Sequence, residues 1–104
     1  MKIKFLATSN APSSYKFIND VVVANHHGAQ IEIDLSSLDY GDKVESIEID
    51  GEEQSSVIRE VFRDKNGVLN AILCQKAPLN SNWVESDWID SSDYDKNILY
   101  IKEE

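Results

Sequence analysis

Residues 57–75 read VIREVFRDKNGVLNAILCQ, in which two apolar-rich runs flank the tetrapeptide DKNG at positions 64–67. An Asp at the first position and a Gly at the fourth are typical of a type I turn. Gly67 can adopt the left-handed conformation that a three-residue hairpin loop with a β-bulge requires. The segment is therefore predicted to form a β-hairpin. Its expected register pairs Asp64 with Val68, Phe62 with Asn70, Val61 with Ala71 and Arg59 with Leu73.

Both faces of this hairpin carry apolar side chains, because successive residues of a strand point to opposite sides. Val61 and Leu73 fall on one face, and Phe62 and Ile72 fall on the other. A hairpin that is apolar on both sides is typical of the middle of a sheet rather than of an exposed edge. We therefore expect residues 57–75 to lie at the centre of a small all-β domain.

A helix over residues 52–65 is the alternative interpretation of the same segment. The apolar residues between positions 57 and 62 recur at a spacing that would also place them on one helical face. Gly67 would then end the helix, and the fold would be α+β. The β-branched and aromatic residues, together with the turn sequence, favour the strands.

A second hairpin is predicted over residues 21–35. Its turn sequence, NHHG at positions 25–28, again begins with a side chain that can accept a hydrogen bond and ends with Gly. The same loop length would pair Asn25 with Ala29. This register places five apolar residues on one face, with Glu32 and Asp34 pointing the other way. The five are Val21, Val23, Ile31, Ile33 and Leu35.

Shorter strands are predicted elsewhere, separated by loops rich in Ser, Asn, Asp and Gly. They cover residues 1–8, 15–17, 44–50, 83–85 and 98–101, with a loop at 77–82 and a turn or single helical turn at 90–93. The pattern predicts an all-β fold. We expect a small antiparallel sandwich or partly open barrel of about seven to nine short strands, with at most one or two helical turns.

Length and charge restrict the possible functions. The 104 residues suit a single domain over residues 1–104. The net charge of −9 is uneven, with +2 in residues 1–31 and −11 in residues 32–104. Such a surface repels phosphate backbones, so nucleic-acid binding is not expected. The chain has no apolar run of membrane-spanning length and only one cysteine, Cys74. A cytoplasmic protein is therefore expected.

Four carboxylates are candidates for binding a partner. Glu32 and Asp34 share the polar side of one predicted strand, and Glu48 and Asp50 share that of another. If the two strands are neighbours, one outer face of the protein is strongly anionic. Such a face either keeps the protein soluble or docks a basic partner, and at the extreme it mimics a phosphate backbone.

Three aromatic residues form the other candidate group. Trp83, Trp88 and Tyr94 lie in a polar and acidic part of the sequence. The indoles either cover the core with their N–H groups at the surface or form a recognition patch, since Trp and Tyr dominate binding hot spots. A platform on which sugars stack is a special case of that patch.

The sequence does not indicate catalysis, a metal or a cofactor. It has no G-x-S-x-G elbow, phosphate-binding loop or H-E-x-x-H motif. His26 and His27 are adjacent and are expected to point apart, so they are poorly placed to share one metal ion. Cys74 is expected to be a small buried residue. Five carboxylates form an acidic tract, and they are Glu85, Asp87, Asp90, Asp93 and Asp95. This tract lacks the central Gly and the final Glu of a calcium-binding loop.

Three segments in the second half of the chain carry a resemblance. They are residues 57–75, WVESDWID at 83–90 and DYD at 93–95. With these segments the chain resembles small uncharacterised proteins encoded in phage and prophage genomes, which are often found among tail and late structural genes. The resemblance implies a virion-assembly or accessory role in the host cytoplasm or the virion. It implies no chemistry and no site residue.

Three functions follow as expectations. The first is a non-enzymatic, β-rich interaction or structural protein whose partner is another protein or a second copy of itself. The second is an acidic inhibitor that occupies the basic groove of a nucleic-acid enzyme. The third is a carbohydrate-binding module that uses Trp83 and Trp88.

Overall fold

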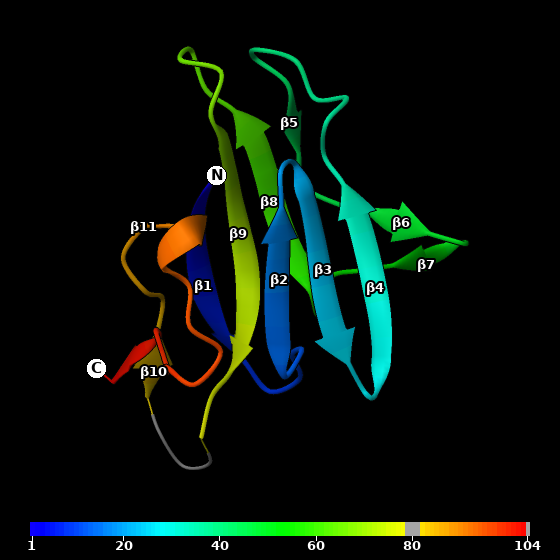
Figure 1. The fold of residues 1–104 in the computed structure, drawn as a ribbon. Helices are drawn as coiled ribbons and strands as arrows, with labels where there is room; N and C mark the ends of the chain where they lie inside the picture. Colours follow the sequence, from blue (N-terminus) through cyan, green and yellow to red (C-terminus); the bar gives the residue numbers. More distant parts are fainter. Residues whose placement is uncertain (79–81, 104) are drawn as a thin grey trace.

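The computed structural model describes residues 1–78 and 82–103 and confirms the all-β prediction (Figure 1). Over these residues it contains twelve strands and one 3₁₀-helix of three residues, Ser91–Asp93. The alternative helix over residues 52–65 is wrong. That segment instead contains strands β7 (Glu52–Glu53) and β8 (Ile58–Arg63), joined by a tight turn.

The largest sheet has the predicted central hairpin in its interior. Its five strands follow the order β11 (Ile89–Asp90), β1 (Lys2–Thr8), β9 (Leu69–Lys76), β8 and β5 (Lys43–Val44). Strands β8 and β9 form the antiparallel hairpin, whereas β1 runs parallel to β9. This parallel pairing joins Lys2, at the beginning of the chain, to Asn70. The sheet is therefore mixed, with both parallel and antiparallel pairs of strands.

The predicted register is confirmed close to the turn of this hairpin. Phe62 pairs with Asn70, and the N–H of Asp64 donates to the carbonyl of Val68 over 3.0 Å. Gly67 has a φ of +79°, the left-handed conformation that the loop was expected to require. The turn sequence therefore predicts how these two strands pair next to the turn.

At the far end of the hairpin the predicted pairing of Arg59 with Leu73 is wrong. The register shifts between Ile58 and Glu60, and Ile58 lies opposite Leu73. The shift is a β-bulge, which adds one residue to β8. Because of it, Ile58 is buried in the core while Arg59 is exposed.

The second sheet has three antiparallel strands, β2 (Ser14–Ile18), β3 (Val21–His26) and β4 (Ala29–Asp34), in that order. It lies in front of β8 in Figure 1, where it runs from blue to cyan. Side chains from both sheets form one hydrophobic core. That core includes Ile3, Phe5, Tyr15, Val22, Ala24, Ile33, Val57, Val61 and Leu73.

The predicted register of the β3–β4 hairpin is wrong by one residue. His26 pairs with Ala29, so the loop has only two residues, His27 and Gly28. Both have positive φ angles, 52° and 78°, as a type I′ turn requires. A shift of one residue exchanges the two faces of a strand. In β3 the residues that join the core cluster are therefore Val22 and Ala24, whereas Val21 is only partly buried and Val23, although buried, lies outside that cluster.

Two other predicted strands differ in the structure. The strand expected over 44–50 is divided into β5 and β6 (Glu48–Ile49), and β6 pairs with β7. The strand expected over 98–101 is a loop, and the last described strand is β12 (Lys102–Glu103), which pairs with β10 (Trp83–Val84). The loop expected over 77–82 lies partly outside the described residues.

Some expectations for short segments are confirmed. Residues 15–17 lie within β2, and residues 83–84 form β10. The turn expected at 90–93 is the 3₁₀-helix, which the Asp90 side chain caps by accepting a hydrogen bond from the Ser92 N–H over 3.0 Å. Within residues 1–78 and 82–103, none of the helical structure is long and apolar enough to cross a membrane.

Candidate functional site

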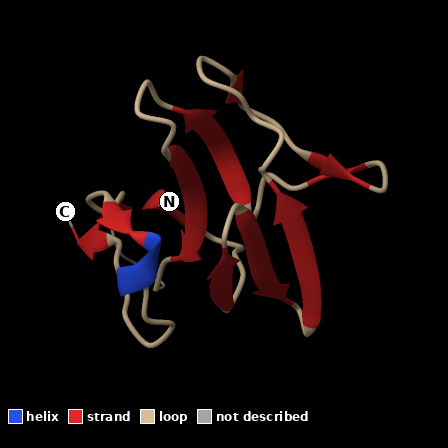
Figure 2. Cartoon of the chain, turned by 45° about the horizontal axis from the view of Figure 1, so that its top comes forward, coloured by secondary structure: helices blue, strands red, loops and turns tan. Residues whose placement is uncertain are grey.

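An acidic arm extends from the body of the protein. We use this name for β6, β7 and the turn between them, residues 48–53. Figures 1 and 2 show it reaching away from the two large sheets. Asp50 and Gly51 form its turn with φ angles of 53° and 82°, which is the behaviour expected of an Asp-Gly pair in a type I′ turn. Its carboxylates are Glu48, Asp50, Glu52 and Glu53.

An acidic groove lies between this arm and β4. We use this name for a cavity of about 520 Å³ that is lined by four carboxylates and, among the described residues, by no lysine or arginine. Strand β4 is an edge strand of its sheet. One side of the groove is therefore a strand edge that can pair with a further extended segment. The four carboxylates are Glu32, Asp50, Glu52 and Glu53.

The carboxylates of the arm and groove differ from those of the acidic tract in their ion pairing. In the part of the chain that the structure describes, none of them forms an ion pair. The acidic tract, in contrast, is partly neutralised by lysines from other segments. Its pairs are Glu85 with Lys4 at 2.9 Å, Asp87 with Lys102 at 2.6 Å and Asp90 with Lys2 at 3.9 Å.

The structure brings two of the four predicted carboxylates, Glu32 and Asp50, into the acidic groove. Asp34 lies on the same strand as Glu32, but its Oδ1 accepts a hydrogen bond from the Ser36 N–H over 2.9 Å. The side chain and backbone of Ser36 hold the pKa of Asp34 below its usual value. Glu48 lies on the arm, outside the residues that line the groove.

The expectation that Glu48 and Asp50 share a strand face is wrong. Strand β6 ends at Ile49, and Asp50 belongs to the turn. Sequence analysis also missed Glu52 and Glu53 as site residues. The Asp-Gly pair at 50–51 was the signal that could have found them, because it predicts a hairpin that folds residues 52 and 53 back beside β6.

His26 contributes the imidazole that lines the acidic groove. Its Nδ1 is buried without a hydrogen-bond partner. Burial, followed by the neighbouring His27, lowers the pKa of His26, so its neutral form is favoured. The two rings lie 4.1 Å apart, which corrects the expectation that they point apart. The left-handed conformation of His27 at the turn explains this closeness.

The described residues contain no group of three or more His, Cys, Asp or Glu side chains arranged to hold a metal ion. Cys74 is fully buried, as expected, and burial raises the pKa of its thiol. A thiol in this setting is a poor nucleophile, because the thiolate is the reactive form. The chemistry that the site offers is electrostatic attraction and hydrogen bonding by carboxylates.

The three predicted aromatic residues have different environments. Trp83 packs against the core, and its indole Nε1 is buried without a partner. The Tyr94 ring contacts Phe5, its hydroxyl accepts a hydrogen bond from the Tyr15 N–H over 3.1 Å, and burial raises its pKa. Trp88 is the most exposed of the three at 40%. Trp83 is partly buried against the core, so it offers less of its ring to a sugar than Trp88 does.

The exposed indole of Trp88 contacts two other side chains. The Lys4 ammonium lies 5.6 Å from the centre of the Trp88 ring, and the Phe62 ring meets it edge-on at 6.4 Å. Contacts of this kind fix an exposed indole in one orientation.

Comparisons of the chain with protein-family models, with curated protein sequences and with solved structures found no match.

Proposed function

We propose that this protein is a non-enzymatic docking protein that binds a positively charged surface or segment of a protein partner through its acidic arm and acidic groove. The observation that carries the proposal is the unpaired state of the carboxylates there. The acidic tract shows that this chain can supply lysines to its own acids. Among the residues that the structure describes it supplies none to the arm, and these charges are therefore available to a partner.

The charges on the arm destabilise the pairing of its own two strands. Like charges directly opposite each other destabilise a strand pair, and Glu48 lies opposite Glu53. Lysine or arginine side chains from a partner would remove this repulsion on binding. Complementary charge also speeds association and excludes partners of the wrong sign.

The edge of β4 adds a second means of recognition. An extended segment can add to an exposed strand edge through main-chain hydrogen bonds, while its side chains reach the neighbouring surface. A segment beside β4 would lie next to Glu32 on one side and the arm carboxylates on the other. We include in the proposal that this docking serves virion assembly, within the host cytoplasm or the virion, which the resemblance to phage and prophage proteins supports.

A lysine-rich extended peptide tests the docking function directly. We expect it to bind the wild-type protein and to bind less tightly as salt is added. Replacement of Glu52 and Glu53 by Gln should weaken binding. The matched control replaces Asp93 and Glu103, which are exposed carboxylates outside the groove, by Asn and Gln. Equal weakening in both double variants would show that only net charge matters, and the docking site would then be rejected.

The same carboxylates support a second candidate, an acidic inhibitor that mimics a phosphate backbone. The observation that favours it is the gathering of Asp50, Glu52 and Glu53 on a projecting arm that could enter a basic groove. Such an inhibitor should compete with DNA for a nucleic-acid enzyme. Absence of competition at low ionic strength would exclude it, whereas peptide binding would be unaffected.

A further inference from the structure

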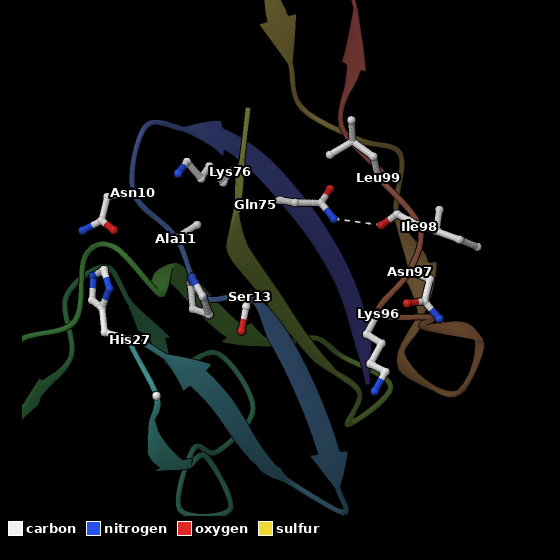
Figure 3. A pocket seen from close by; sticks show the side chains of 12 residues that line it. Asn10, Ala11, Ser13, His27, Gln75, Lys76, Lys96, Asn97, Ile98 and Leu99 are labelled. Carbon is white, nitrogen blue, oxygen red and sulfur yellow. Dashed lines mark hydrogen bonds between the residues drawn. The ribbon is translucent and has the colours of Figure 1, made fainter. Parts of the chain in front are cut away.

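A second groove of the protein is lined by basic rather than acidic side chains. We call it the basic groove, a cavity of about 580 Å³ shown in Figure 3. It lies between the loop 10–13, the end of β9 and the segment 96–99, with the β3–β4 turn beside it. Among the described residues, Lys76, Lys96 and His27 line it and no carboxylate does.

The two lysines of this groove are available for contact with a partner. Within residues 1–78 and 82–103, neither Lys76 nor Lys96 forms an ion pair. The chain has 19 acidic and 10 basic residues, so acids are in excess. Five bases do pair with carboxylates in the described structure, and they are Lys2, Lys4, Lys43, Arg63 and Lys102.

One wall of the basic groove is held in place by Gln75. Its side-chain Nε2 donates to the carbonyl of Ile98 over 3.0 Å, as the dashed line in Figure 3 shows. Its Oε1 accepts hydrogen bonds from the N–H groups of Tyr100 and Ile101 over 2.8 and 3.1 Å. The segment is therefore fastened to β9, while Ile98 and Leu99 remain 48% and 43% exposed. A wall fixed in this way presents its apolar side chains without further ordering.

We propose that the basic groove receives the acidic arm of a second copy of this chain. This inference rests on the proposed docking function and names its partner. Each copy carries an arm whose carboxylates, and a groove whose lysines, form no ion pair within the described part of the chain. In Figure 1 the arm extends to the right, whereas the segments lining the basic groove meet at the lower end of the molecule. One copy's arm entering another copy's groove makes a heterologous contact, which leaves a free arm at one end and a free groove at the other.

The net charge of −9 on each copy opposes this contact at long range. At low ionic strength that repulsion reaches far, and at high ionic strength salt weakens the ion pairs themselves. The Debye length is about 8 Å at physiological ionic strength, so distant charges are screened there while contacting charges still attract. We therefore expect self-association to be strongest at intermediate salt and to decline on either side.

Sedimentation velocity on the full chain tests the proposal with two neutralising variants. The groove variant carries Lys76→Gln and Lys96→Gln, and the arm variant carries Glu52→Gln and Glu53→Gln. Each alone should associate at least about tenfold more weakly than the wild type, the factor expected for loss of about 1.4 kcal/mol of interaction. Mixed together, they should form a complex that stops at one copy of each, because each variant retains one intact half of the contact.

A matched control variant carries Lys16→Gln and Lys65→Gln. These lysines also lack ion pairs among the described residues but lie outside the basic groove, and the variant changes the net charge by the same amount as the groove variant. It should associate like the wild type. Equal loss in the control and groove variants would overturn the proposal, as would a wild type that stays monomeric at every ionic strength.

The peptide experiment separates this inference from the docking function on which it rests. A monomeric wild type that still binds the lysine-rich peptide through its arm would refute self-association and leave docking to a different protein in place. A wild type that neither self-associates nor binds the peptide would refute both.

Discussion

Glu48 and Glu53 lie directly opposite each other across the two strands of the acidic arm. Both are exposed, and both lie on strands of only two residues. Such a pair opposes the folding of the hairpin that carries it. A binding role explains the arrangement better than a structural one, because the charges that weaken the arm are the same charges that would attract a basic partner.

Relieving this repulsion should stabilise the protein and impair docking together. Glu53→Lys places opposite charges at the pair, and we expect the free energy of unfolding to rise by about 0.2–1 kcal/mol. Urea denaturation at neutral pH measures this change, and Glu53→Gln should give a smaller rise. The same Glu53→Lys variant should bind the lysine-rich peptide less tightly. Lower stability in Glu53→Lys would show that the opposed glutamates do not repel one another significantly.

The Tyr15 hydroxyl connects the two sheets inside the core. It lies 2.6 Å from the Cys74 carbonyl and 3.1 Å from the Val57 carbonyl, and it accepts from the Cys74 N–H over 3.2 Å. Burial raises its pKa, so it stays protonated and able to donate. Tyr15→Phe leaves buried backbone groups with fewer partners and should cost about 1–3 kcal/mol of stability.

Chemical denaturation measures this loss, with Tyr40→Phe as the control because Tyr40 is 70% exposed. The control should match the wild type within about 0.5 kcal/mol, the range usual for surface substitutions. Equal stability of the two variants would mean that the buried hydroxyl contributes nothing measurable.

Local turn chemistry explains which parts of the fold the sequence reveals. The DKNG turn predicts the register near Gly67 because only a few loop geometries suit that residue order. The second hairpin misled the prediction because its type I′ turn begins with His27, whereas Asn, Asp or Gly is typical of that position. The pairing of β1 with β9 is equally hidden, since a parallel contact between distant segments leaves no short-range signal.

The candidate site, like the fold, could be predicted from the sequence only in part. Glu32 and Asp50 were recognisable as exposed acids, but their meeting in one groove depends on how the arm leaves the body. The unpaired state of Lys76 and Lys96 was also beyond sequence analysis. Whether a lysine meets a carboxylate is decided by tertiary contacts such as that of Lys4 with Glu85, which are 81 residues apart.

The conformation of Gly67 gives a clean test of the central turn. Its φ of +79° disfavours any residue with a Cβ, and no atom lies within 4 Å of the position that a Cβ would take. Gly67→Ala should therefore lower stability by about 1–2 kcal/mol through backbone strain alone. Gly67→Asn should lower it less, because Asn tolerates the left-handed region better. Denaturation curves measure both, and an Ala variant as stable as the wild type would contradict the assigned turn.

The same turn should make stability depend on pH through Asp64. The Asn70 side chain, 3.1 Å from Oδ2, is the largest cause that holds the pKa of Asp64 below its usual value, followed by the Val68 N–H at 3.1 Å from Oδ1. A pKa that is lower in the folded state stabilises the protein above the unfolded-state value of about 4. That contribution is lost as the pH falls from about 4 through the folded-state pKa.

Asp64→Asn should therefore reduce the difference between the stabilities measured at pH 7 and pH 3. Denaturant titrations at both values supply the comparison, and the other aspartates contribute equally to both proteins. Asn70→Ala provides the intermediate case, because it removes the first cause of the lowered pKa but leaves the backbone donors. An Asp64→Asn protein that loses as much stability on acidification as the wild type would show that the turn carboxylate does not supply this pH dependence.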